Sequence, residues 1–343
     1  MQIGATDLCK DEIEREIKIE FFKSVTSGKH KILDSIESMT LAQLKEGNAE
    51  YQGKGRKASL QLQNLKVERQ HSFLEYVFGG CAVDLSIAID FTLSNGDPRS
   101  PDSLHYLDPN RNQYMHAIQS VGNILQFYNT DKQINLYGFG GAIPPYSNRG
   151  SHCFALNGDI FNPRVNGIQE VMQCYQRALN TCKLYGPTNF AEIINEVNNN
   201  ILSEPVNQMY QKFHILVIIT DGVISDMNKT IDEIVRGSEL PLAIIIVGVG
   251  DADFESMETL DGDDEALYSQ AYRKYMAADI VQFVPFNDFK HNPHLLAKET
   301  LMEVPTQLLN WMRKQGISPH PRTEEQRRLI QQQLSMRQSA GPG

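Results

Sequence analysis

One stretch of the sequence decides the fold: Val83-Asp-Leu-Ser-Ile-Ala-Ile-Asp-Phe-Thr-Leu-Ser94. Its first half is an apolar run with the length and composition of a buried strand. Asp90, Thr92 and Ser94 then follow at alternate positions. Ligands of open α/β sheets bind in the crevice at the carboxyl ends of the strands. Because one carboxylate with two hydroxyls suits a hard divalent cation, the stretch predicts an ion site at the edge of a sheet.

Two later segments add oxygen ligands to this candidate site. Phe213-His-Ile-Leu-Val-Ile-Ile-Thr-Asp221 is a second apolar run that ends in a carboxylate, and Gly186-Pro-Thr188 places a hydroxyl at a turn before a helix. The predicted metal ligands are therefore Asp90, Thr92, Ser94, Thr188 and Asp221.

This set resembles the metal-ion-dependent adhesion site of von Willebrand factor A domains, and the resemblance implies that the five residues hold Mg²⁺ or Mn²⁺ directly or through water. The surrounding segments resemble one family of such domains, the copines, from about Ser72 to Pro321. The matching segments are Asp90-Phe-Thr-Leu-Ser-Asn-Gly-Asp-Pro98, Leu104-His-Tyr-Leu-Asp-Pro109, Tyr137-Gly-Phe-Gly140, Tyr185-Gly-Pro-Thr-Asn189, Ile218-Ile-Thr-Asp-Gly-Val-Ile-Ser-Asp226 and Ile246-Val-Gly-Val-Gly-Asp-Ala-Asp-Phe254.

The remaining pattern predicts alternating strands and helices. Apolar residues from Tyr114 to Tyr128 recur at helical spacing, and Leu242-Ala-Ile-Ile-Ile-Val247 has the composition of a strand buried on both faces. A last helix is predicted over roughly 293–314. The expected fold class is α/β: a doubly wound, mostly parallel sheet with helices on both faces, similar to von Willebrand factor A domains, preceded by a partial β-sandwich segment.

Three regions are expected along the 343 residues. Residues 1–75 resemble a partial C2-like β segment with a linker, residues 76–321 a copine or von Willebrand factor A domain, and residues 322–343 form a polar tail predicted to be disordered. Copines carry two C2 domains before the A domain. Since only half of one is recognisable here, the chain is interpreted as a short form or a fragment.

The resemblance implies Ca²⁺-dependent binding to anionic phospholipid membranes, but the residues of the C2-like segment argue against Ca²⁺. Lys23 and Lys31 stand where carboxylate ligands are expected, and ammonium groups repel a cation. A basic run from Lys54 to Arg69 has two interpretations: weak contact with anionic lipid, or lysines that protect a strand edge.

Composition limits the function classes. A net charge of −10 argues against a nucleic-acid partner, since phosphates require a basic surface. A membrane span and a signal peptide are not expected, and five cysteines without metal spacing indicate free thiols. The chain is therefore predicted to be cytoplasmic, with peripheral association at the plasma membrane as the family implies.

Several motifs have competing interpretations. Asp90 could be a phosphotransfer nucleophile, but Thr92 stands where that chemistry needs a second carboxylate. Gly138-Phe-Gly-Gly141 is a weak dinucleotide motif and is better explained as a tight strand exit, and the acidic residues from Asp251 to Asp264 favour a solvated turn over a calcium loop. His116 and His214 are predicted to be packed, while Asp226 either supports the ion or caps a helix.

Two functions from different classes follow. The first is a non-enzymatic adaptor, in which an acidic side chain of a partner protein completes the shell of the ion. The alternative is a metal-dependent hydrolase or phosphotransferase that uses the same ion as a Lewis acid. The adaptor is favoured because no His, Lys or Cys is tied to the five ligands as a base or nucleophile.

Overall fold

The computed structural model describes residues 12, 14–23, 30–45, 50–61, 69–143, 148–159, 161–262 and 265–321. The chain divides into two compact units, Met1–Gln70 and His71–Gly343. The predicted tail at 322–343 lies outside the described residues, as do Lys66 of the basic run and Asp263 and Asp264 of the acidic turn.

The first unit contains antiparallel strands, as predicted. β1 (Glu16–Lys23) pairs with β2 (Lys31–Thr40), and β3 (Glu50–Gln52) pairs with β4 (Ser59–Gln61). A short helix, α2 (Leu41–Lys45), follows β2. The small apolar core of this first unit consists of Ile17, Ile36, Met39, Leu41 and Leu44.

The second unit is built on a seven-stranded sheet with the order β15-β12-β11-β5-β6-β8, in which β9 also pairs with β6. The pairs among β15, β12, β11, β5 and β6 are parallel, whereas β8 and β9 run antiparallel to β6. The bounds are β5 (Ala82–Asp90), β6 (Gln133–Phe139), β8 (Phe154–Ala155), β9 (Arg164–Asn166), β11 (Lys212–Thr220), β12 (Leu242–Gly248) and β15 (Val281–Pro285).

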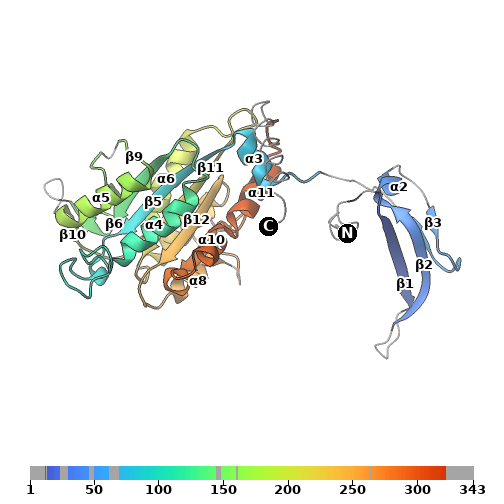
Figure 1. The fold of residues 1–343 in the computed structure, drawn as a ribbon, viewed down its shortest axis with the longest axis horizontal. Helices are drawn as coiled ribbons and strands as arrows, with labels where there is room; N and C mark the ends of the chain where they lie inside the picture. Colours follow the sequence, from blue (N-terminus) through green and yellow to red (C-terminus); the bar gives the residue numbers. More distant parts are fainter. Residues whose placement is uncertain are drawn as a thin grey trace, which may run out of the picture. The chain divides into compact units, whose positions relative to one another are not determined.

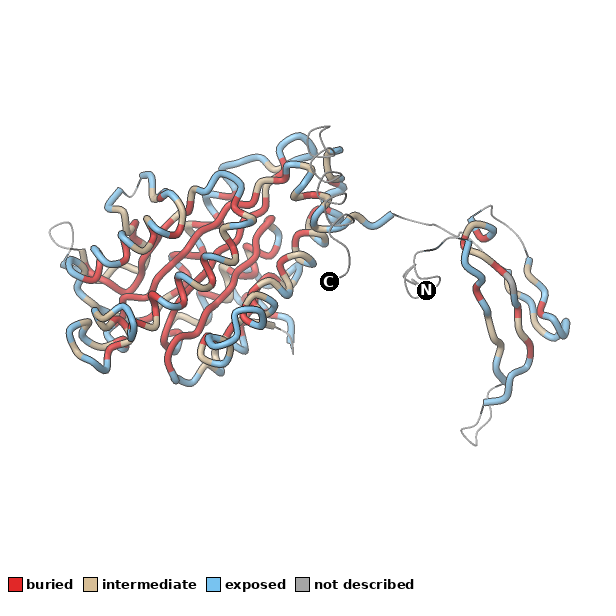
Figure 2. The backbone as a smooth tube through the Cα atoms, viewed as in Figure 1, coloured by how far each residue is buried: buried red, intermediate tan, exposed pale blue. Residues whose placement is uncertain are grey.

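Helices cover both faces of this sheet, which explains its near-continuous apolar strands. In β11, Ile215 and Val217 pack on one face, while Leu216 and Ile218 pack on the other. The first face is covered by α4 (Gln113–Leu125), α5 (Gly167–Thr181), α10 (Pro293–Leu301) and α11 (Val304–Lys314), and the second by α6 (Ala191–Ser203), α7 (Met227–Gly237) and α8 (Glu255–Asp261) (Figure 1). Figure 2 shows the central strands buried along nearly their whole length. The predicted doubly wound α/β fold is thereby confirmed.

Smaller elements connect these layers. α3 (Phe73–Gly79) begins the second unit with a capping box, in which Ser72 and Glu75 satisfy each other's backbone N–H groups. The others are the 3-10 turn η1 (Leu93–Asn95), β7 (Gly141–Ala142) with β10 (Lys183–Leu184), β13 (Tyr268–Ser269) with β14 (Lys274–Tyr275), and α9 (Phe286–Phe289).

Two predictions from the sequence are wrong. The single helix expected over 293–314 is two helices, α10 and α11, separated at Met302–Glu303, because Pro305 has no N–H to donate to the carbonyl four residues earlier and its ring crowds that carbonyl. His116 is exposed rather than packed, since it lies on α4 opposite the buried stripe of Tyr114, Ala117 and Ile118.

Candidate metal centre

The structure brings all five predicted ligands together at the carboxyl edge of the sheet. Thr92 donates its hydroxyl proton to Asp90 Oδ1 at 2.6 Å, and Ser94 donates to Asp221 Oδ1 at 3.0 Å. Thr188 Oγ1 lies 3.4 Å from Thr92 Oγ1, which in turn lies 3.0 Å from Ser94 Oγ. The five side chains thus form one connected group of oxygen atoms.

The group is buried except on one side. Asp90 is 0% exposed, and Thr92, Thr188 and Asp221 are also buried, whereas Ser94 is exposed. Gly222 contributes to the space around the oxygens, because a Cβ atom there would lie 3.7 Å from Ser94 Oγ and 3.9 Å from Thr188 Oγ1. Access to the cluster from solvent is therefore on the side of Ser94.

The pKa of each of the two carboxylates is raised. Burial raises the pKa of Asp90, although hydrogen bonds from Thr220 and Thr92 oppose that effect. Burial, followed by the negative charge of Asp90, raises the pKa of Asp221 to about 7. Within the described residues, neither carboxylate forms an ion pair with Lys, Arg or His.

The donor set fits a hard divalent cation. With both carboxylates ionised, Thr92 and Ser94 each donate their single proton to a carboxylate, so no proton remains for the 3.0 Å contact between the two hydroxyl oxygens. Their lone pairs then face each other, an arrangement that a cation relieves. Among the described residues, no group of three or more His, Cys, Asp and Glu side chains could hold a metal. The hydroxyls are thus an essential part of this set.

Thr220 and Asn95 support the site and were not found from the sequence. Thr220 Oγ1 donates to Asp90 Oδ2 at 2.6 Å, so both oxygens of that carboxylate are held. Asn95 Nδ2 donates to the carbonyl of Thr92 at 3.2 Å and fixes the turn after β5. The available signal for Thr220 was its position next to Asp221 at the end of the apolar run.

His105 was also missed, and it lies beneath the site. A backbone carbonyl only accepts hydrogen bonds, so His105 Nε2 donates to the carbonyl of Asp90 at 2.8 Å, and Nδ1 accepts from the Tyr175 hydroxyl at 2.7 Å. The ring stacks on Tyr114 and Phe91, with centroids 4.1 Å and 5.5 Å away. Burial lowers the pKa of His105 to about 3, so a neutral imidazole positions the end of β5.

Asp226 holds the segment that carries Thr188; its interpretation as a cap of α7 is wrong, and its interpretation as support for the ion stays a prediction. It occupies the N-cap position of α7 without capping that helix, and its carboxylate instead accepts from Phe190 N and Ala191 N, both at 3.1 Å. Ser225 N donates to the carbonyl of Thr188 at 2.8 Å. The loop after β11 therefore fixes the turn that presents the Thr188 hydroxyl.

Other motifs are explained by local structure. Gly140 follows β6 with φ of 68°, and a Cβ atom there would lie 2.2 Å from Thr92 Cγ2, so this glycine permits close approach to the ion-site turn. Asp253 accepts from Glu255 N at the start of α8, in agreement with a turn and helix start. Cys81, Cys153, Cys174 and Cys182 are free thiols, and His214 is buried as predicted.

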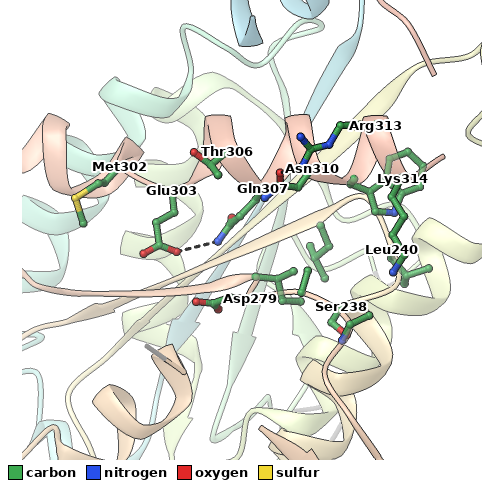
Figure 3. Close-up of a pocket in the computed structure, with 15 residues that line it drawn as sticks. Ser238, Leu240, Asp279, Met302, Glu303, Thr306, Gln307, Asn310, Arg313 and Lys314 are labelled. Atoms are coloured by element: carbon green, nitrogen blue, oxygen red, sulfur yellow. Dashed lines mark hydrogen bonds between the residues drawn. The ribbon is translucent and has the colours of Figure 1, made fainter. Parts of the chain in front are cut away.

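A cavity of about 610 Å³ lies beside α11 at the other edge of the sheet (Figure 3). Its wall includes Leu242 and Ile280, at the amino ends of β12 and β15, together with side chains of α11. Its wall contains acidic residues, Asp279 and Glu303, and basic residues, Arg313 and Lys314. It is therefore not part of the metal centre, which lies at the carboxyl ends of the strands.

Two solved structures resemble the fold at low similarity. They are the manganese-loaded TRAP protein of Plasmodium vivax (13% identity, TM-score 0.38, 62% of this chain and 71% of that chain) and the mussel byssus proximal thread matrix protein 1 with a zinc-occupied MIDAS motif (14% identity, TM-score 0.35, 64% of this chain and 46% of that chain). Both TM-scores are below 0.5, so the fold class rests on this chain's own sheet topology. That topology is a doubly wound, mostly parallel α/β sheet, as expected from the resemblance to von Willebrand factor A domains.

The sequence model of the copine family matches residues 103–320. Copine-A of Dictyostelium discoideum is 41% identical over 332 residues, which cover 94% of this chain and 55% of Copine-A. The chain belongs to the copine family, and it spans about half the length of this curated relative.

Proposed function

We propose that the second unit binds one Mg²⁺ or Mn²⁺ through Asp90, Thr92, Ser94, Thr188 and Asp221. The observation that carries the proposal is the convergence of two carboxylates and three hydroxyls, without a positively charged partner among the described residues. A bound divalent cation supplies the missing positive charge. Thr220, Asn95 and His105 keep the ligand oxygens in place.

The proposed role of the centre is that of an adaptor. Protein surrounds the oxygen cluster except beside the exposed Ser94, so a ligand from outside approaches there. An aspartate or glutamate of a partner protein has the charge and oxygen atoms to complete the shell. A hydrolytic role is less well supported, because the nearby base, His105, is fully buried and both of its ring nitrogens are engaged.

We propose that the first unit, Met1–Gln70, is a C2-like β segment and that the second unit contains the A domain, so the boundary lies a few residues before the one expected at 75/76. Within the described residues, every helix falls short of the length and apolar character needed to cross a bilayer. We propose a cytoplasmic protein whose association with membranes is peripheral and weak. The calcium response implied by the family is not assigned to this chain.

Metal-dependent stability tests the centre. If only the folded state binds, Mn²⁺ at 100 times its dissociation constant raises the free energy of unfolding by about 2.7 kcal/mol. Asp221→Asn should abolish this increment. The matched control is Asp102→Asn, at an exposed aspartate outside the cluster, and it should keep the full increment. A melting temperature of the parent protein that Mn²⁺ leaves unchanged would exclude the site.

Water relaxation separates the adaptor from the hydrolase. Bound Mn²⁺ with an open position speeds the relaxation of exchanging water protons, and a short peptide with one glutamate should reduce that effect, whereas its glutamine counterpart should not. The hydrolase alternative predicts Mn²⁺-dependent turnover of p-nitrophenyl phosphate that Asp221→Asn removes. Turnover with these properties would overturn the adaptor role, even if metal binding were confirmed.

A further inference from the structure

A second cavity, of about 640 Å³, lies between α4 and the segment around α9. Arg111 and His116 line it from the α4 side, and Lys290 and His291 line it from the α9 side. Carboxylates are absent from its wall among the described residues. In a chain with a net charge of −10, a cavity lined by four basic side chains and no acidic one is a local reversal of charge.

Arg111 and Lys290 carry the permanent positive charges of the cavity, and no carboxylate among the described residues pairs with either. Arg111 donates from Nη2 to the carbonyl of Pro101 at 2.9 Å, and its guanidinium lies 5.0 Å from the ring centre of Tyr106. Lys290 Nζ donates to Asn287 Oδ1 at 3.0 Å. Neither forms an ion pair with a carboxylate in the described part of the chain. Arg111 is therefore oriented and retains most of its five N–H donors.

The rest of the wall suits a polar ligand. Amide and hydroxyl groups come from α4, on Gln113, Gln119, Ser120 and Asn123, and the buried Phe286 contributes a phenyl ring. Two carboxylates lie one hydrogen bond away from the wall without lining it: Asp251 accepts from Asn287 Nδ2 at 2.8 Å, and Asp108 accepts from Asn110 N at 3.0 Å. Small-molecule sites have volumes of roughly 300–1,000 Å³, so the cavity is large enough for a small molecule.

We propose that this cavity binds a small molecule that carries more than one phosphate group. Spaced cations match several phosphates rather than one, and guanidinium and ammonium groups form short, charge-assisted hydrogen bonds with phosphate oxygens. The exposed amides provide further donors. The site uses none of the five proposed metal ligands, so it is independent of the metal centre.

Isothermal titration of the full chain with inositol trisphosphate in EDTA tests the proposal, because the chelator keeps the metal centre out of the measurement. The parent protein should bind one equivalent. Arg111→Gln and Lys290→Gln should each weaken binding by about tenfold, as expected for the loss of one charge-assisted hydrogen bond, and the double variant should show no measurable binding. The matched control is Lys229→Gln, at an exposed lysine of α7 on the other face of the sheet, and it should bind like the parent.

A phosphorylated ligand could be free or could be a lipid headgroup, and a second arm distinguishes the two. Phosphatidylcholine vesicles with and without phosphatidylinositol bisphosphate are sedimented with the protein in EDTA. Recovery only with the phosphorylated lipid, lost in the double variant, indicates a lipid source, whereas binding of the free trisphosphate alone indicates a soluble ligand. The proposal is overturned if the parent does not bind the trisphosphate, or if Lys290→Gln, which changes only an exposed side chain, binds as tightly as the parent.

Discussion

The hydroxyl of Thr220 supports the candidate metal centre, and a single substitution can remove its hydrogen bond while leaving the shape of the side chain unchanged. Thr220→Val keeps the shape of the side chain but removes the 2.6 Å hydrogen bond to Asp90 Oδ2. A buried acceptor that loses its donor destabilises a protein by about 1–3 kcal/mol. Urea unfolding in EDTA should show this loss, and Mn²⁺ should bind more weakly because the carboxylate is less well positioned.

Thr220→Ser is the control for that experiment, since it restores the hydroxyl without the methyl group. Its stability and Mn²⁺ affinity should lie close to those of the parent. If valine and serine behaved alike, the hydrogen bond would have no part in the centre.

His214 should make the protein less stable in acid. Burial lowers the pKa of His214 to about 4, against about 6.5 in an unfolded chain. Between these values the unfolded state binds more protons, so the free energy of unfolding falls as the pH is lowered from 6.5 towards 4. The contribution of His214 over that window is about 3 kcal/mol.

The measurement is the difference in unfolding free energy between pH 7 and pH 4.5, compared for the parent and His214→Gln. The variant should lose less stability in acid than the parent. His294→Gln, at an exposed histidine of α10, should behave like the parent. Equal acid sensitivity of the His214 variant and the parent would contradict the prediction.

The five proposed ligands could be selected from the sequence because each lies at the end of an apolar run or at the turn before a helix. Their supporting residues could not. His105 reaches the carbonyl of Asp90 from 15 positions away, and Thr220 reaches its carboxylate from 130 positions away. Such contacts are set by tertiary packing, which local patterns do not encode.

Among the secondary-structure elements, α6 is held at its amino end by a side chain distant in the sequence. The carboxylate of Asp226 satisfies two N–H groups at its amino end. Asp226→Ala should destabilise the second unit by about 1–3 kcal/mol and weaken Mn²⁺ binding, because the turn with Thr188 loses its anchor. Urea unfolding and Mn²⁺ titration measure the two effects, and Asp226→Asn should restore part of both. Unchanged Mn²⁺ affinity in Asp226→Ala would mean that Thr188 is held by other contacts.

The long elements were predictable and the short ones were not. β5, β11 and β12 are apolar runs buried on both faces, a pattern with few alternatives, and α4 and α6 show clear amphipathic stripes. β7, β8 and β10 have two residues each, too few for any periodicity. Pro305 marks the break between α10 and α11, but a single helix was predicted because apolar residues continue on both sides of the proline.

For the whole molecule, the clearest test concerns calcium and membranes. Lys23 and Lys31 pair at the ends of β1 and β2 and are exposed, and Asp34 already accepts from the backbone N–H groups of Gly55, Lys57 and Ala58. We therefore expect no calcium-dependent sedimentation with phosphatidylserine vesicles. Any binding should come from the basic run at 54–69 and should decrease as salt is raised.

The comparison is the fraction recovered in the pellet with micromolar calcium and with chelator. Vesicles of phosphatidylcholine alone serve as the control for nonspecific recovery. Clear calcium-dependent recovery would show that the chain has a membrane function that the charge of its first hairpin does not predict.

The distance along the chain between the ligands has a consequence for synthesis. Ser94 and the aspartate that it contacts are 127 residues apart, and β11 must enter the sheet beside β5 before they meet. On the ribosome, the first three ligands leave the exit tunnel long before the last one is translated. A nascent chain therefore lacks the complete set of proposed ligands for most of its elongation, and the proposed ion can bind only once β11 lies beside β5.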